Sequence, residues 1–74
     1  MRFEADFRHE EGDREITIYG RLTRRELETL AWFRESGRAD PEVTAMAMAL
    51  RHAYREAPAG FLHIKAGVRL LPDQ

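Results

Sequence analysis

The hydrophobic pattern of this chain changes its period twice, and these two changes constrain the fold more than any other feature. Residues 2–8 alternate between apolar and charged side chains, which is typical of a half-buried strand. Across residues 24–57 the apolar side chains recur three and four positions apart, which predicts helices. From Phe61 the alternation returns. The chain therefore predicts strands at both ends with helices between them.

The first part of the pattern predicts an antiparallel hairpin. The first strand covers residues 2–8, and the polar residues 9–13 suit a hairpin loop because they combine acidic side chains with a glycine. The second strand covers residues 14–20. The side chains predicted to face the core are Phe3, Ala5, Phe7, Ile16 and Ile18.

The start of the first helix carries the strongest local signal. Thr23 and Glu26 fit a capping box, in which each side chain accepts a hydrogen bond from the backbone N–H of the other residue. Leu22 and Leu27 match the hydrophobic staple that accompanies such a box. Gly37 is suited to end the helix in the left-handed conformation. The predicted core face carries Leu27, Leu30 and Ala31, flanked by Phe33.

A second helix is predicted to begin at Pro41. Asp40 is a suitable N-cap, and proline loses no hydrogen bond at the first helical position because its N–H would have no partner there. Pro58 and Gly60 end the helix. The predicted core face carries Val43, Met46, Ala47, Leu50, Ala53, Tyr54 and Ala57, with Ala45 and Ala49 on a flank.

The last strand is predicted to begin at Phe61, with a bulge or turn at residues 66–67. The side chains expected to face the core are Leu62, Ile64, Val68 and Leu70. Those expected on the opposite face are Phe61, His63, Lys65 and Arg69.

These elements predict one α+β domain over residues 1–74, a two-layer sandwich of order ββααβ. Two antiparallel helices would cover one face of a three-stranded sheet. If each element reverses the direction of the one before it, the third strand runs parallel to the first and antiparallel to the second. It could pair beside either strand, and the order 1-2-3 is favoured.

Composition excludes several classes of protein. The chain has 74 residues, no cysteine and a formal charge of −1, so it can form no disulfide or thiolate metal site and has no overall field that attracts polyanions. Its longest apolar run, residues 45–50, is far too short to cross a bilayer. The start of the chain lacks the pattern of a secretory signal. A cytoplasmic location is therefore expected.

Catalytic chemistry finds little support. Thr23 and Ser36 are accounted for as residues at helix ends, and the acids of residues 10–13 lack the spacing of a calcium loop. His9, His52 and His63 lie on three different elements without paired metal-ligand spacing. We expect neither an enzyme nor a cofactor or metal site.

Two large apolar side chains fall outside the predicted core faces. On helical wheels, Trp32 and Met48 point well away from the centre of those faces. They either fill the seam between the helices or form a contact patch with Arg25, Arg51 and Arg55, since Trp, Met and Arg are enriched in interface cores. The second alternative predicts a binding site for a partner protein or for a second copy.

The leading hypothesis is therefore a non-enzymatic protein–protein interaction module. Such a module would be a small regulatory or inhibitory accessory protein, of the kind that a phage or mobile element encodes against a host defence complex, and would act by occupying a surface of a protein or macromolecular complex. One alternative is a structural subunit or homodimer. The other is a nucleic-acid-binding module, whose open sheet face would present Tyr19, Phe61, His63, Lys65 and Arg69.

Overall fold

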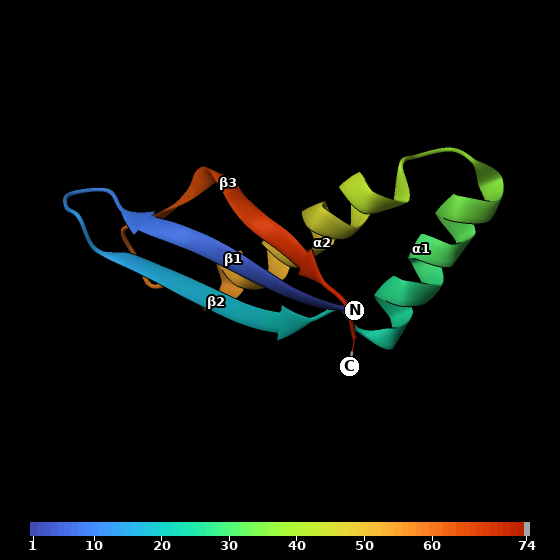
Figure 1. Cartoon of the computed structure of the whole chain (residues 1–74), viewed down its shortest axis with the longest axis horizontal. Helices are drawn as coiled ribbons and strands as arrows, with labels where there is room; N and C mark the ends of the chain where they lie inside the picture. The colour runs from blue at the N-terminus through green and yellow to red at the C-terminus, as the bar shows by residue number, and fades with distance from the viewer. Residues whose placement is uncertain (74) are drawn as a thin grey trace.

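The computed structural model describes residues 1–73, and for residues 64–66 it describes the backbone only. The elements, in chain order, are β1 (Arg2–His9), β2 (Glu15–Arg21), α1 (Arg24–Ser36), α2 (Pro41–Glu56) and β3 (Phe61–Leu71) (Figure 1). This confirms the α+β class, with an antiparallel sheet and two helices. Among the described residues, no helix is both long and apolar enough to cross a membrane.

The capping signals lie where the sequence predicted them. The N–H of Glu26 donates to Thr23 Oγ1 at 3.2 Å, and Glu26 Oε1 accepts the N–H of Thr23 at 2.8 Å. Gly37 ends α1 with a φ of 66°, in the left-handed region. Asp40 caps α2 by accepting the N–H of Glu42 at 2.9 Å. The ends of both helices are thus fixed by local hydrogen bonds.

The covering layer is a single helix, and this differs from the predicted pair. α2 packs against all three strands, whereas within the described chain the backbone of α1 comes close to α2 and to no strand. Figure 1 shows α1 standing beyond the end of the sheet while α2 runs behind it.

The strand order is β2-β1-β3, so β1 is central and the favoured order 1-2-3 is wrong. Both neighbours are antiparallel to β1, which also corrects the predicted parallel relation between the first and last strands. The reason is that α1 does not run along the sheet. Only α2 runs back along the sheet between β2 and β3. The chain therefore reverses its direction one time fewer than predicted, and β3 runs antiparallel to β1.

The last strand is interrupted, so the predicted ββααβ order with three strands is inexact. The step from Ala5 to Phe7 on β1 is matched on β3 by the longer step from Val68 back to His63. Residues 61–63 and 68–71 therefore pair with opposite ends of β1, and as separate strands they make the order ββααββ. The predicted irregularity is present. Because of it, the side chains that face α2 are those of odd-numbered residues in 61–63 and those of even-numbered residues in 68–71.

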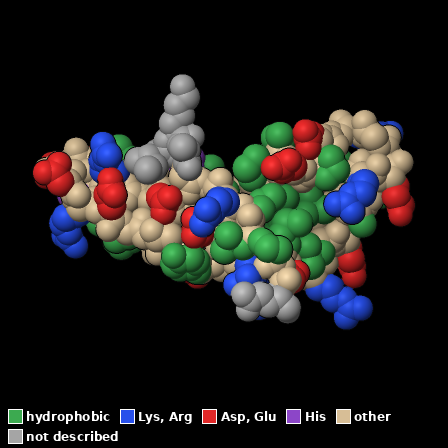
Figure 2. All heavy atoms as spheres, viewed as in Figure 1, with side chains coloured by type: hydrophobic (Ala, Val, Ile, Leu, Met, Phe, Trp, Pro, Cys, Tyr) green, Lys and Arg blue, Asp and Glu red, His purple; other side chains and the backbone are tan. Residues whose placement is uncertain are grey.

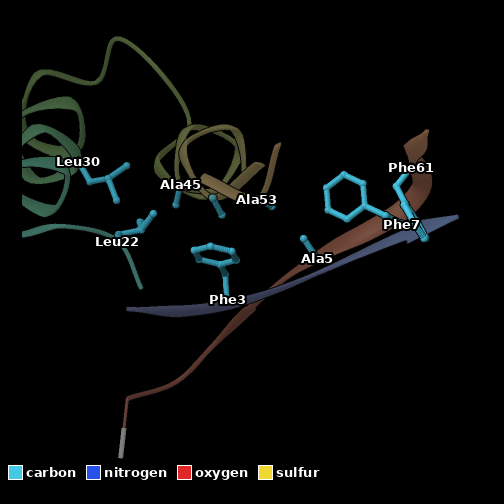
Figure 3. Close-up of a cluster of buried hydrophobic side chains, with 9 residues drawn as sticks. Phe3, Ala5, Phe7, Leu22, Leu30, Ala45, Ala53 and Phe61 are labelled. Carbon is cyan, nitrogen blue, oxygen red and sulfur yellow. The ribbon is translucent and has the colours of Figure 1, made fainter. Parts of the chain in front are cut away.

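The core lies between β1 and α2, and it pairs large side chains with small ones. β1 contributes Phe3 and Phe7, both buried, and α2 contributes a stripe of alanines. Figure 3 shows Phe3 beneath this stripe with Leu22 and Leu30 closing one end, while Phe7 and Phe61 fill the other end. The buried residues are Phe3, Ala5, Phe7, Leu22, Leu30, Ala45, Ala49, Ala53 and Phe61.

The observed face of α2 corrects the predicted one. Ala45 and Ala49, placed on a flank by the sequence argument, face the sheet together with Ala53. Val43 is 59% exposed, and Ala47 is also exposed. The helix is apolar over most of its circumference, and small side chains allow the closest approach of its backbone to the aromatic residues of β1. Close packing of α2 against β1 therefore places the alanines, and not the larger apolar side chains, against the sheet.

Candidate functional site

The described part of the chain has a groove between α1 and α2, with a volume of about 650 Å³. Each helix contributes residues one turn apart. The groove is lined by Arg25, Glu26, Thr29, Met48, Arg51, His52 and Arg55. Four of the five residues predicted to form a partner patch thus come together, joined by Glu26, Thr29 and His52, which the sequence argument did not include.

The two sides of the groove are tied by a contact between Glu26 and His52. Glu26 Oε1 lies 2.6 Å from His52 Nε2, close enough for the imidazole N–H to donate to the carboxylate. The same oxygen accepts the backbone N–H of Thr23. Burial by itself raises the pKa of Glu26, but the hydrogen bonds from Thr23 and His52 outweigh it and hold this pKa below its ordinary value. The groove therefore contains a carboxylate that is already engaged.

The positive charge of the groove comes from Arg25, Arg51 and Arg55, which are all exposed. In the described part of the chain, no carboxylate forms an ion pair with any of these three guanidinium groups. Arg51 and Arg55 are four residues apart on α2, so their side chains leave the same side of the helix. The groove thus presents guanidinium groups that are free to bind an anion.

Met48 supplies the apolar part of the groove. It is half-buried, packs against the core cluster and also lines the groove, which agrees with the prediction that the sheet does not bury it fully. Met48 thus sits in the seam between the helices, as the first alternative predicted, while the partner contact of the second alternative stays a prediction.

Trp32 does not line the groove, and its side chain is 50% exposed. Its ring lies 5.1 Å from that of Phe33, and the Arg38 guanidinium carbon lies 5.5 Å from the ring centroid. Trp32 follows Arg25 by seven residues and Thr29 by three, which places it on the same side of α1 as these groove residues. Trp32 therefore lies on the side of α1 that faces the groove, next to the groove but outside its lining.

The open sheet face lacks the predicted set of nucleic-acid residues. Phe61 is buried, and the His63 ring lies 6.0 Å from that of core residue Phe7, so both are on the α2 side of the sheet. Tyr19, which is 65% exposed, and Arg69 do lie on the open face. The Lys65 side chain lies outside the described residues. The interruption of β3 is the reason, because it reverses the sides of residues 61–63.

The remaining charges of the open face are largely paired across the strands. Arg69 lies 2.8 Å from Glu4, and Arg8 lies 3.2 Å from Glu15. The Thr17 hydroxyl donates to Asp6 at 2.7 Å. Among the described residues, Arg8 and Arg69 are thus both paired with carboxylates of the neighbouring strand.

A second groove lies at the junction of the helices with the end of β3. Figure 2 shows hydrophobic side chains gathered over this region. Its volume is about 320 Å³, and its lining residues are Met1, Leu30, Arg34, Asp40, Pro41, Glu42, Ala45 and Leu70. Both charge signs are present at its rim, and it therefore indicates no particular ligand.

Neither metal-binding geometry nor comparison with known proteins gives a further guide to function. Across the residues that the structure describes, no three His, Asp or Glu side chains come together in a way that could hold a metal ion. Comparison with protein families, curated proteins and solved structures found no match for this chain.

Proposed function

We propose that this protein is a non-enzymatic interaction module that regulates or inhibits a partner by occupying part of its surface. The observation that carries the proposal is the groove between α1 and α2, which Arg25, Arg51 and Arg55 line together with Met48. Arginine and methionine are enriched in interface cores, and guanidinium groups bind carboxylates through two parallel hydrogen bonds.

Two contacts that hold the helices in place also support this function. The capping box fixes the start of α1, and the contact between Glu26 and His52 ties α1 to α2. A surface held in one geometry before binding loses less conformational entropy when a partner docks. A small module can then bind through a limited area.

The test is capture of partners by the tagged protein from a lysate of its own host, with and without nuclease. We expect one protein complex in stoichiometric amount that survives nuclease. A fall in recovery for a variant that carries Arg51→Glu and Arg55→Glu, if the variant stays folded by circular dichroism, would show that the partner contacts the groove. Material lost on nuclease treatment would favour a nucleic-acid-binding module instead.

Recovery of the bait alone would contradict the proposal and favour the third alternative, a structural or self-associating subunit. Sedimentation velocity at several concentrations then distinguishes the remaining cases. A mass that rises with concentration indicates self-association.

A further inference from the structure

We propose that the groove between α1 and α2 binds an acidic segment of a partner protein, with carboxylates on Arg25, Arg51 and Arg55 and an apolar side chain against Met48. This inference rests on the proposed function and specifies the chemistry of the partner. It is carried by the charge of the groove, by the spacing of its cations and by the apolar side chain of Met48.

The charge of the groove favours an anionic occupant. Three exposed guanidinium groups share the groove with one carboxylate, that of Glu26. This carboxylate already accepts from Thr23 and contacts His52 at 2.6 Å, so it does not neutralise the arginines. An incoming carboxylate would bind without first displacing an internal ion pair.

The spacing of the cations suits carboxylates on a peptide backbone. Arg51 and Arg55 are one helical turn apart, which separates their Cβ atoms by about 5–6 Å. Acidic residues two positions apart on an extended segment are separated by about 7 Å, and those one turn apart on a helix are as close as the arginines. Arg25 lies on the opposite wall and can contact the other side of the segment.

The neighbouring charges favour a protein segment over a nucleic acid. A phosphate backbone carries charge along its whole length, whereas the two helices that form the groove also carry exposed acids, Glu28 on α1 and Glu56 at the end of α2. The half-buried Met48 also suits an apolar side chain, which a phosphate backbone does not offer.

The experiment titrates the protein with a synthetic peptide of repeated Glu-Glu-Leu and follows the fluorescence of Trp32, the only tryptophan of the chain, supported by calorimetry. Two control peptides replace Glu by Lys or Leu by Ala. A single-stranded oligonucleotide serves as competitor. The variants are Arg51→Glu and Arg55→Glu, with Arg24→Glu as matched control because Arg24 is 95% exposed and lies outside the groove.

We expect Arg51→Glu and Arg55→Glu each to weaken binding of the acidic peptide by about ten- to a hundredfold, since each removes a charged hydrogen-bonding partner. Arg24→Glu changes the net charge equally and should have little effect. The Lys peptide should not bind, and the Ala peptide should bind more weakly. Rising salt should weaken binding of the acidic peptide.

Three results would overturn the inference. In the first, Arg24→Glu weakens binding as much as the groove variants do, so the effect is one of net charge. In the second, the oligonucleotide binds more tightly than the peptide and displaces it. In the third, the groove variants lose no affinity for a protein captured from the lysate. The last result leaves the proposed function intact and refutes only the acidic-segment site.

Discussion

The carboxylate of Glu26 joins two helices through one oxygen: Oε1 accepts the N–H of Thr23 at 2.8 Å and lies 2.6 Å from His52 Nε2. The first contact caps α1, and the second fixes α2 beside it. Residues 26 positions apart in sequence thereby join the two walls of the groove. The groove geometry should therefore depend on Glu26 even though α2, and not α1, covers the sheet.

Replacing Glu26 tests this double role. Glu26→Ala removes both contacts, and we expect a loss of about 1–2 kcal/mol in the free energy of unfolding, the usual effect of losing a helix cap together with a hydrogen bond. Glu26→Gln keeps an acceptor oxygen for the Thr23 N–H and should cost clearly less. Urea unfolding at neutral pH measures both. Equal losses for the two variants would show that the negative charge matters more than the cap.

The lowered pKa of Glu26 makes stability depend on acid pH. The ordinary pKa is 4.5, and the folded state holds it lower. A carboxylate of this kind contributes stability fully above its unfolded-state pKa and loses the contribution as the pH falls through the folded-state value. We therefore expect the difference in unfolding free energy between the native protein and Glu26→Gln to shrink below about pH 4.5.

Urea unfolding at a series of pH values from about 6 to 3 measures this difference, and the window follows from the linkage of pKa to stability. Asp73 also has a pKa below its ordinary value, because its carboxylate accepts a hydrogen bond from the N-terminal amine. Both proteins retain Asp73, so its contribution cancels in the comparison. A difference that stays constant over the whole series would contradict the prediction.

Local signals in the sequence identified the helix ends and the core side of β1, because their physical causes lie within a few residues. Thr23 and Glu26 bond to each other, and Gly37 takes a conformation that glycine favours. The face of α2 could not be found in this way. Residues on several sides of that helix are apolar, and only the close approach of the sheet selects Ala49 over Ala47.

The candidate site was predictable in part. Arg51 and Arg55 follow Met48 on its own side of α2, so the sequence alone placed these three residues, which line the groove, near one another. The contact between Glu26 and His52 was missed because it depends on how the two helices pair. Helical spacing does place both residues on the groove side of their helices. Comparing the helical wheels of α1 and α2 could therefore have suggested the pair.

The alanine stripe of α2 predicts a sharp contrast between neighbouring positions. Ala49 is fully buried against the sheet, so Ala49→Leu forces the helix away from β1 and should destabilise the fold by about 1–3 kcal/mol or more. Ala47 is exposed, and Ala47→Leu should change stability by less than about 0.5 kcal/mol. Thermal unfolding of both variants measures the contrast. Equal effects would mean that α2 does not dock through its alanines.

The pairing of Gly20 with Phe3 across the sheet predicts a second contrast. A Cβ at position 20 would lie 2.6 Å from the ring Cζ of Phe3, so Gly20→Ala must displace a buried ring. We expect it to cost about 1–3 kcal/mol. Gly12, in the hairpin loop, has no atom within 4 Å of the corresponding position, and Gly12→Ala should be almost neutral. Similar urea midpoints for the two variants would contradict this packing.

Trp32 and Met48 should respond differently to truncation, since the structure gives them different environments. Met48 packs against the core, and Met48→Ala should lower stability by about 1–2 kcal/mol, below the roughly 2–5 kcal/mol of a fully buried methionine. Trp32 is half exposed beside Phe33, and Trp32→Ala should cost less than about 1 kcal/mol.

Urea unfolding followed by circular dichroism separates this folding effect from binding, and capture of the partner measures the second. If the groove side of the helix pair is the contact surface, both variants should recover less partner at temperatures where each is fully folded. Met48→Ala should have the larger effect because Met48 lines the groove while Trp32 lies beyond it. Sharp destabilisation by both variants with undiminished capture would instead assign both side chains to folding, because a contact residue cannot be truncated without weakening the complex that it forms.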